Sequence, residues 1–338
     1  MGKSYFAHIM NRKIELIDFL KGFSIFTIVV YHLLYKLPQL SAIKNALLMG
    51  GTGVHTFILI SGFGLYLSYL RKKLSFFDFI KKRFTKIYLP YIFIVTISAL
   101  IALCIPIYKN SLYAYLGHVF LYKMFDGNII TSYGYQLWFI STIIQFYLIF
   151  NLLAYLKGKL SPRAFFMVGI FTYFLWVMIV WLLGKENYGN WNRSCFQFLW
   201  EFMLGMVLAE LYARRGELWK IKQIYLLLIS VAGFVLYGLM ALKMGSIGKL
   251  LNDIPAMFGY TTLAIFIYQL GIKAVNKFFV FTGVISYSLY LTHVLIQVII
   301  LYILKIAGVQ VSLAAAALML ILSYFVSYLF NKLISKYI

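Results

Sequence analysis

The sequence predicts an all-helical, polytopic integral membrane protein with about ten transmembrane helices. Of its 338 residues, 63% are hydrophobic and only 12% are charged, which is about half the charged share of a soluble domain. Apolar runs of about twenty residues recur along the whole chain, and each is long enough to cross a hydrocarbon core of roughly 30 Å. The alternation over ten-residue strands that marks a membrane β-barrel is missing.

We expect one transmembrane domain over residues 1–338, with a helical core at about 14–335 and no appended soluble domain. No small-residue cleavage site follows the first apolar run, so we expect no cleaved signal peptide. The predicted spans are residues 15–36, 46–70, 88–107, 135–156, 165–183, 194–212, 223–242, 254–272, 279–303 and 311–331.

The basic residues predict the orientation of the chain. The formal net charge of +22 would point to nucleic acid in a soluble protein, but membrane proteins collect Lys and Arg in their cytoplasmic loops. Between the predicted spans, 21 of the 31 Lys and Arg residues fall on the side of the two termini and 9 on the other side. We therefore expect cytoplasmic termini, an even number of spans and no nucleic-acid partner. The Ile-, Phe-, Tyr- and Lys-rich composition is compatible with a bacterial plasma membrane.

The first predicted helix carries Asp18, Lys21 and His32 within an apolar run. Eleven residues turn a helix through nearly whole turns, so Lys21 and His32 share one face about 16 Å apart along the axis. Asp18 and Lys21 are three residues apart and can pair. The simplest structural interpretation is a buried ion pair plus an interfacial histidine. Ionisable groups in membranes usually serve function, however, and an imidazole at depth suits a general base.

Six segments carry motifs in a fixed order, and together they resemble the membrane acyltransferase 3 family. The first is Asp-Phe-Leu-Lys-Gly at 18–22 with Tyr-His at 31–32, which is similar to that family's Arg followed eleven places later by His. The others are GVHTFILISGF at 53–63, KKRFTKIYLPY at 81–91, LWFISTIIQFYL at 137–148, LWEFMLGMVLA at 199–209 and ISYSLYLTH at 285–293. The likeness spans residues 14 to about 300 and includes the ten-helix plan.

The resemblance implies transfer of an acyl group, usually acetyl, from cytoplasmic acyl-CoA to a hydroxyl of a carbohydrate, exopolysaccharide or cell-envelope acceptor. It implies no bound cofactor, with acetyl-CoA or another acyl-CoA as co-substrate, and a carbohydrate or lipid-linked glycan and membrane lipid as partners. Two departures matter. Lys21 replaces the family's arginine, which keeps the charge but loses the bidentate fork. Ile143 and Ile144 stand where many members carry acidic residues, so no role of a glutamate there can be transferred.

The same resemblance suggests roles for the charged residues. His32 would remove the proton of the acceptor hydroxyl or carry the acyl group itself, and the sequence leaves both routes open. Asp18 would hold Lys21, and Lys21 would stabilise the donor or the developing charge. The phosphates of the donor would pair with a basic loop, although ordinary positive-inside charge also explains that loop. Its residues are Arg83, Lys86 and the neighbouring Lys82.

Five further side chains are candidates for the channel or the acceptor site, and all except Tyr287 have a structural alternative. Ser61 would contact substrate or pack closely between helices. Trp138 would line the path or belong to an interfacial aromatic belt. His293, which follows Tyr287 in the same motif, would act in the site or be a hydrogen-bonded core histidine. Glu201 would pair with an inward-facing base or serve the channel.

The remaining histidines and cysteines indicate no metal site. The histidines are scattered without the pair spacing of metal motifs, and Cys104 and Cys195 fit packing better than a disulfide. We expect His55 to pack or hydrogen-bond between helices and His118 to be solvated in a loop.

A transporter of glycans or lipid-linked sugars is the main alternative from another functional class. Exporters also combine apolar helices with buried charges. They often show inverted repeats and broken helices, whereas this sequence has no convincing symmetry between its halves. The Lys21–His32 pair discriminates between the acyltransferase and transporter hypotheses, because acyl transfer needs such groups and simple transport does not.

Overall fold

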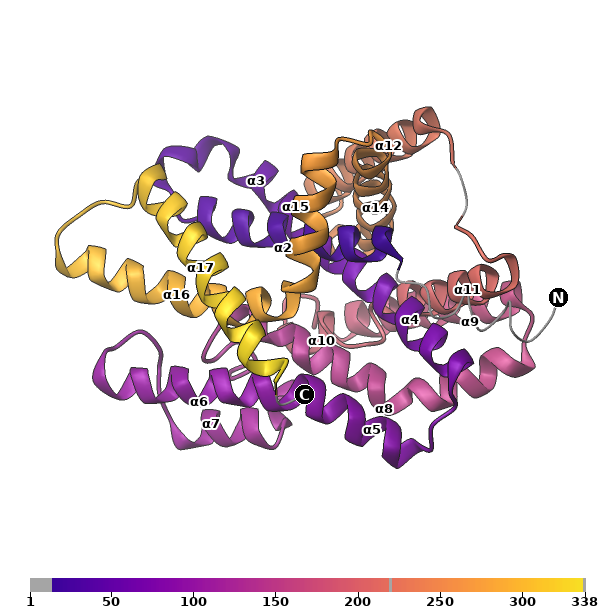
Figure 1. The fold of residues 1–338 in the computed structure, drawn as a ribbon, viewed down its shortest axis with the longest axis horizontal. Helices are drawn as coiled ribbons and strands as arrows, with labels where there is room; N and C mark the ends of the chain where they lie inside the picture. Colours follow the sequence, from indigo (N-terminus) through magenta and orange to yellow (C-terminus); the bar gives the residue numbers. More distant parts are fainter. Residues whose placement is uncertain (1–13, 219–220, 337–338) are drawn as a thin grey trace.

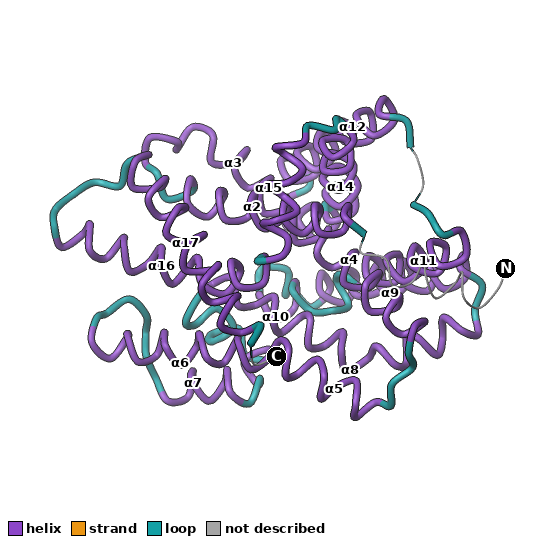
Figure 2. Tube along the Cα trace, in the orientation of Figure 1, coloured by secondary structure: helices purple, strands orange, loops and turns teal. Residues whose placement is uncertain are grey.

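The computed structural model describes residues 14–218 and 221–336, and all secondary structure in this part of the chain is helical (Figures 1 and 2). The predicted fold class is therefore confirmed. Eight helical segments are long and apolar enough to cross a membrane, and a ninth is counted if the pair bent by 46° at residue 252 forms one span. The count of ten spans and the cytoplasmic termini stay predictions. The basic residues before residue 14, and Lys220, lie outside the described residues.

Each of the ten predicted spans contains a helix, but the ninth begins later than expected. Residues 279–284 belong to α15, and a separate helix starts at Ser286. The α-helices are α2 (Glu15–Leu34), α3 (Lys44–Leu47), α4 (Gly53–Arg71), α5 (Phe76–Arg83), α6 (Leu89–Cys104), α7 (Leu112–Val119), α8 (Trp138–Lys159), α9 (Pro162–Leu182), α10 (Gly189–Asn192), α11 (Leu199–Arg215), α12 (Gln223–Lys243), α13 (Gly245–Leu251), α14 (Asp253–Gln269), α15 (Lys273–Val284), α16 (Ser286–Ile306) and α17 (Leu313–Ile334). Short helical turns are η1 (Pro38–Ile43), η2 (Leu48–Thr52), η4 (Tyr122–Met124), η5 (Tyr135–Leu137) and the π-helical η3 (Phe84–Tyr88).

Local sequence signals set several helix ends. Ser75, Ser111, Ser161 and Ser312 each stand at an N-cap, where the side chain accepts a hydrogen bond from the backbone N–H three residues later. Helix α11 ends at Gly216, which has a φ of 81° that only glycine adopts readily. These caps place the turns of the bundle between the apolar runs.

Close contacts at glycines hold two helix pairs together. A Cβ atom added at Gly62 of α4 would lie 2.1 Å from the Phe202 carbonyl oxygen of α11, and one added at Gly205 of α11 would lie 2.0 Å from the Leu59 carbonyl oxygen. Glycine allows helix backbones to approach this closely in membranes. A similar reciprocal contact joins α2 to α15 and fixes the first helix in the bundle; it is formed at Gly22 and Gly283.

We expect Gly62→Ala to lower the thermal unfolding midpoint of the purified protein, because the new methyl group would overlap the backbone of α11. Overpacking of this kind costs about 1–3 kcal/mol. Gly64→Ala is the matched control on the same helix, since a Cβ atom there meets nothing within 4 Å. A thermal denaturation series in detergent measures both variants. Equal midpoints for the two would contradict the packing described here.

The segment between α6 and α8 folds back against the bundle. Helix α7 lies beside α6 (Figure 1), and the Tyr88 hydroxyl donates to the Val119 carbonyl oxygen at 2.5 Å. The expectation that His118 is solvated is wrong. Its ring is fully buried, with Nδ1 2.6 Å from the Tyr91 hydroxyl and Nε2 2.8 Å from the Ser132 hydroxyl. The returning segment covers the histidine, which local sequence alone does not indicate.

A buried lysine anchors the end of this segment. Lys123 is fully buried, and its Nζ donates to the Leu137 carbonyl oxygen at 2.8 Å. Burial lowers the pKa of Lys123 to about 7. The bond fixes the backbone where η5 leads into α8, and therefore holds the residues on either side of Leu137 in place.

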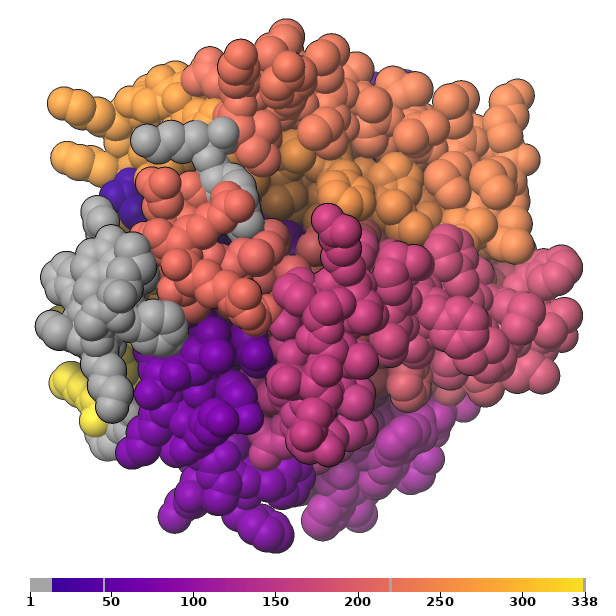
Figure 3. Space-filling model, turned by 90° about the vertical axis from the view of Figure 1, so that its right-hand side faces the viewer, coloured from indigo at the N-terminus to yellow at the C-terminus, as the bar shows by residue number. Residues whose placement is uncertain are grey.

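Several basic turns reach one end of the bundle. Figure 3 shows this face, where the segments near residues 70–85 (purple), 150–165 (magenta) and 210–218 (salmon) come together. The exposed bases in these segments are Arg71, Lys72, Lys73, Lys81, Lys82, Lys159, Arg163, Arg214 and Arg215. The clustering agrees with the charge asymmetry of the sequence.

Candidate active site

The first helix pairs its acid and base as predicted. The Lys21 ammonium lies 3.2 Å from the Asp18 carboxylate, three residues earlier on α2. Lys21 stays partly exposed, and it lies within electrostatic range of Lys86 at the junction of α5 and α6. The structure therefore brings the cation of the first helix to the basic loop that the sequence assigns to donor phosphates.

Four cations gather at this junction. Lys86 lies within electrostatic range of Arg83 and Lys82 as well as Lys21. The Arg83 guanidinium stands over the Phe79 ring at 5.6 Å, and its buried Nε has no hydrogen-bond partner among the described residues. Arg83, Lys82 and Lys86 also have no carboxylate partner there. The three cations without a carboxylate partner lie close together and favour a polyanionic ligand.

A π-helical turn and a tyrosine connect this junction to α16. The chain between Arg83 and α6 forms the π-helix η3, a local irregularity that is frequent at functional sites. The Tyr287 hydroxyl donates to the Ile87 carbonyl oxygen of that turn at 2.5 Å. Tyr287, predicted for the channel, therefore links the start of α16 to the cationic junction.

Helix α16 carries a polar seam. Tyr287, Tyr290, His293 and Gln297 are spaced by three or four residues and so share one face. The Tyr290 hydroxyl donates to the Gln136 carbonyl oxygen at 2.8 Å, and the Gln297 amide donates to the His32 carbonyl oxygen at 2.8 Å. The seam extends from the cationic junction to His32 over about 15 Å of helix.

His32 and His293 form a stacked, hydrogen-bonded pair. The His32 Nδ1 lies 3.0 Å from the His293 Nε2, and the two rings are nearly parallel with centroids 5.2 Å apart. His293 is buried, whereas His32 is partly exposed. The sequence selects both residues but does not indicate their contact, because 261 positions separate them.

The hydrogen bonds assign the protons of the neutral pair. The His293 Nδ1 lies 2.8 Å from the Leu289 carbonyl oxygen, which can only accept, so this nitrogen carries the proton. The His293 Nε2 is then an acceptor, and the His32 Nδ1 must donate to it. The His32 Nε2 is left with a free lone pair, and no described residue hydrogen-bonds to it. This arrangement suits a general base or a nucleophile held in one tautomer.

Aromatic side chains surround the exposed side of His32. Tyr135 meets the His32 ring edge to face at 4.8 Å, and its hydroxyl donates to the Gln297 side chain at 2.9 Å. Trp138, predicted for the path, follows Tyr135 by three residues at the start of α8. Arg193 stands over the Trp138 ring at 5.2 Å. Of these groups, Tyr135 is the one that contacts the imidazole directly.

Glu201 belongs to a separate buried cluster. The His55 Nδ1 lies 2.8 Å from the Glu201 carboxylate, and its Nε2 lies 3.6 Å from Asp253. This confirms that His55 hydrogen-bonds between helices and shows that Glu201 pairs with an inward-facing base. No hydrogen bond joins the cluster to the His32–His293 pair within residues 14–218 and 221–336. Ser61 is half-buried on α4 beside Gly62, at the close contact with α11.

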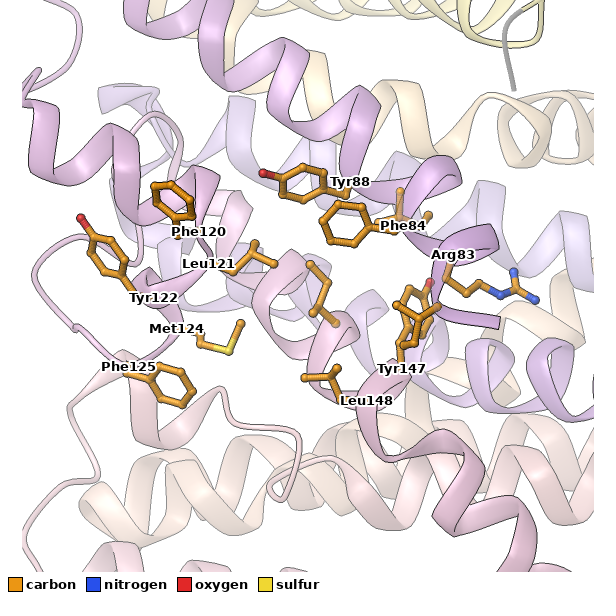
Figure 4. Close-up of a pocket in the computed structure, with 13 residues that line it drawn as sticks. Arg83, Phe84, Tyr88, Phe120, Leu121, Tyr122, Met124, Phe125, Tyr147 and Leu148 are labelled. Carbon is orange, nitrogen blue, oxygen red and sulfur yellow. The ribbon is translucent and has the colours of Figure 1, made fainter. Parts of the chain in front are cut away.

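A lateral cavity of about 340 Å³ adjoins the cationic junction (Figure 4). Arg83 and Tyr147 lie at one end of it, and aromatic and aliphatic side chains line the remainder. Neither histidine of the pair lines this cavity. The cavity therefore adjoins the cationic junction and is not lined by the His32–His293 pair.

Three residues of this site were not predicted from the sequence. In the sequence, Tyr135 and Gln297 look like ordinary residues of apolar helices, and Arg193 looks like an ordinary charged residue of a loop. The seam spacing on α16 is the one signal that could have found Gln297, four residues after His293. No group of three or more His, Cys, Asp or Glu residues placed to hold a metal ion occurs in the described part of the chain.

A comparison with protein-family models identifies an acyltransferase domain. The model described as an acyltransferase domain matches residues 14–332, which is nearly the whole chain. No curated protein and no solved structure gives a significant match.

Proposed function

This chain belongs to the membrane acyltransferase 3 family, and we propose that it is an O-acyltransferase that uses acyl-CoA, with acetyl as the first group to test. The acceptor is a hydroxyl of a carbohydrate, exopolysaccharide or cell-envelope glycan, and the setting is a bacterial plasma membrane. The observation that carries this proposal is the His32–His293 pair. Its one free imidazole nitrogen lies at one end of the polar seam, and uncompensated cations lie at the other.

The cationic junction fits the donor. Arg83, Lys82, Lys86 and Lys21 offer positive charge to the phosphates of coenzyme A. The pantetheine arm is long and thin, and the path from Lys21 to His32 is about 16 Å along α2. We place the arm between α2 and the seam of α16, with the thioester at His32.

The free nitrogen of His32 provides two routes. In direct transfer, Nε2 takes the proton of the acceptor hydroxyl as its oxygen attacks the thioester carbonyl carbon, the C–S bond breaks, and the leaving thiolate recovers the proton. In the covalent route, Nε2 attacks the thioester carbonyl carbon, the C–S bond breaks, and coenzyme A leaves as the thiolate, which gives an acyl-imidazolium. The acceptor hydroxyl then attacks the acyl carbon, the C–N bond breaks, and the proton that the hydroxyl loses neutralises the thiolate. In both routes His293 positions His32 by accepting from Nδ1.

The direct test uses purified protein in nanodiscs with acetyl-, succinyl- and palmitoyl-CoA and a panel of oligosaccharides. Mass spectrometry follows the mass of an acyl ester on the sugar, and a thiol reagent follows release of coenzyme A. We expect one ester for each coenzyme A released with at least one donor. Absence of coenzyme A release with every donor and every glycan would overturn the proposal.

Two basic residues are expected to govern donor affinity. We expect Arg83→Ala and Lys86→Ala each to raise KM for acyl-CoA by about tenfold or more with little change in kcat, because each removes a charge-assisted contact to phosphate. Lys81→Ala is the matched control, since Lys81 is an exposed base two residues before Arg83. Steady-state kinetics measures all three. An equal rise in KM for Lys81→Ala would show that Arg83 and Lys86 act only as ordinary positive charges of the loop and do not form a specific phosphate site.

A further inference from the structure

A second set of cations lies around His32, at the end of the seam opposite the donor. Arg193 stands over the Trp138 ring at 5.2 Å, and Lys36 stands over the Tyr135 ring at 5.7 Å. Tyr135 itself contacts His32. Because η5 leads directly into α8, Tyr135 and Trp138 lie about one helical turn apart. Arg193 also lies within electrostatic range of Tyr31, whose ring centroid is 5.0 Å from that of His32.

Arg193 is half-buried without a counter-charge. It lies within electrostatic range of Tyr31, the residue beside His32 on α2. Among the described residues its guanidinium has neither a carboxylate partner nor a hydrogen-bond acceptor. A guanidinium has five N–H donors, and a partly buried cation with one aromatic face as its partner is poorly compensated.

Carboxylates in this part of the protein have other partners. Asp253 accepts from the Gln197 amide at 2.7 Å and faces His55 at 3.6 Å, and Glu186 accepts from the Ser246 hydroxyl at 3.0 Å. Lys36, one turn beyond His32, is exposed and lies within electrostatic range of that imidazole. The partly exposed imidazole of His32 therefore lies near positive charge and near the Tyr135 ring.

We propose that the acceptor carries an oxyanion close to the hydroxyl that is acylated. Arg193 would bind this group through two parallel N–H donors, Lys36 would add charge, and Tyr135 and Trp138 would offer apolar faces to the sugar ring. The oxyanion is the carboxylate of an acidic sugar or the phosphate of a glycosyl phosphate. This inference rests on the proposed function for calling the ligand the acceptor, whereas the anion site itself does not depend on transfer.

A binding experiment tests this site without catalysis. The full chain in phosphatidylcholine nanodiscs, which carry no net lipid charge, is titrated calorimetrically with a glucuronate oligosaccharide, its methyl ester, a glucosyl phosphate and neutral glucose oligomers. We expect one of the two anionic probes to bind about ten- to a hundredfold more tightly than its neutral counterpart. Which probe wins distinguishes the carboxylate from the phosphate.

Variants locate the effect. We expect Arg193→Gln to remove the preference for the anionic probe and to leave binding of the neutral sugar unchanged, while Arg193→Lys keeps part of the preference because it keeps the charge. Equal binding of anionic and neutral probes, or an unchanged preference in Arg193→Gln, would overturn the inference. Anion binding without any acyl transfer would support the site and count against the proposed function, so the two failures are distinct.

Discussion

Replacing His32 with Ala is expected to lower acyl transfer by about a hundredfold to ten-thousandfold, the range typical of a lost general base. His32 bears the one nitrogen of the pair that is free to accept a proton or an acyl group. A coupled assay of coenzyme A release and ester formation, at saturating donor and acceptor, measures the loss.

The control for this variant separates chemistry from folding. Truncation removes the donor to the buried His293 Nε2, which costs about 1–3 kcal/mol. The unfolding midpoint should therefore fall slightly, while the affinity for acyl-CoA, which depends on the cationic junction, stays close to wild type. A well-folded His32→Ala protein that retains full transfer would exclude both routes through this imidazole. Acylated His32 in the wild-type protein, trapped and seen by mass spectrometry, would select the covalent route.

Replacing His293 with Leu is expected to lower kcat by about a hundredfold, with a smaller effect on KM for acyl-CoA. Leucine cannot accept a hydrogen bond from the His32 Nδ1, so nothing holds the proton of His32 on that nitrogen. When the proton moves to Nε2, Nε2 no longer has a lone pair with which to act as the base. The pH profile of kcat should also change, because the variant removes the ring whose nitrogen accepts the proton of His32 Nδ1.

His293→Gln is the matched variant for this prediction. Its amide oxygen offers an acceptor to His32 in place of the imidazole nitrogen, so part of the activity should return relative to His293→Leu. Identical kcat values and identical pH profiles for wild type and His293→Leu would show that His293 is a core histidine with no influence on the base.

The hydrogen bond between His32 and His293 has no evident use in a transporter. Moving a glycan across the bilayer needs a path and charge compensation, but it does not need an imidazole held in one tautomer by a second histidine. This contact favours group transfer over export, the alternative that the sequence leaves open.

Periodic features of the chain were predictable from the sequence. Apolar runs indicate the helices, and the eleven-residue spacing places Lys21 and His32 on one face of α2. Motif order indicates the family, and the three-residue spacing of Asp18 and Lys21 predicts their pair. Each of these inferences uses residues that are close in sequence or a pattern that recurs at helical spacing.

Contacts between distant segments were not predictable in this way. The His32–His293 contact depends on how α2 and α16 pack, and the burial of His118 depends on the return of α7 along α6. The start of α16 at Ser286 was also missed, because residues 279–284 are apolar enough to extend the span while their packing on α2 needs a separate helix. Arg193 reaches its ring through loop geometry, which carries no periodic signal.

In the proposed mechanism, donor and acceptor meet across the bundle, with the donor at the cationic junction and the acceptor at His32. The most direct measurement encloses an accepted glycan in sealed proteoliposomes and adds radiolabelled acetyl-CoA outside, for wild type and His32→Ala. We predict labelled glycan inside the vesicles and coenzyme A outside for the wild type, and neither for the variant. Labelled glycan formed solely when donor and acceptor share one side of the membrane would contradict this account.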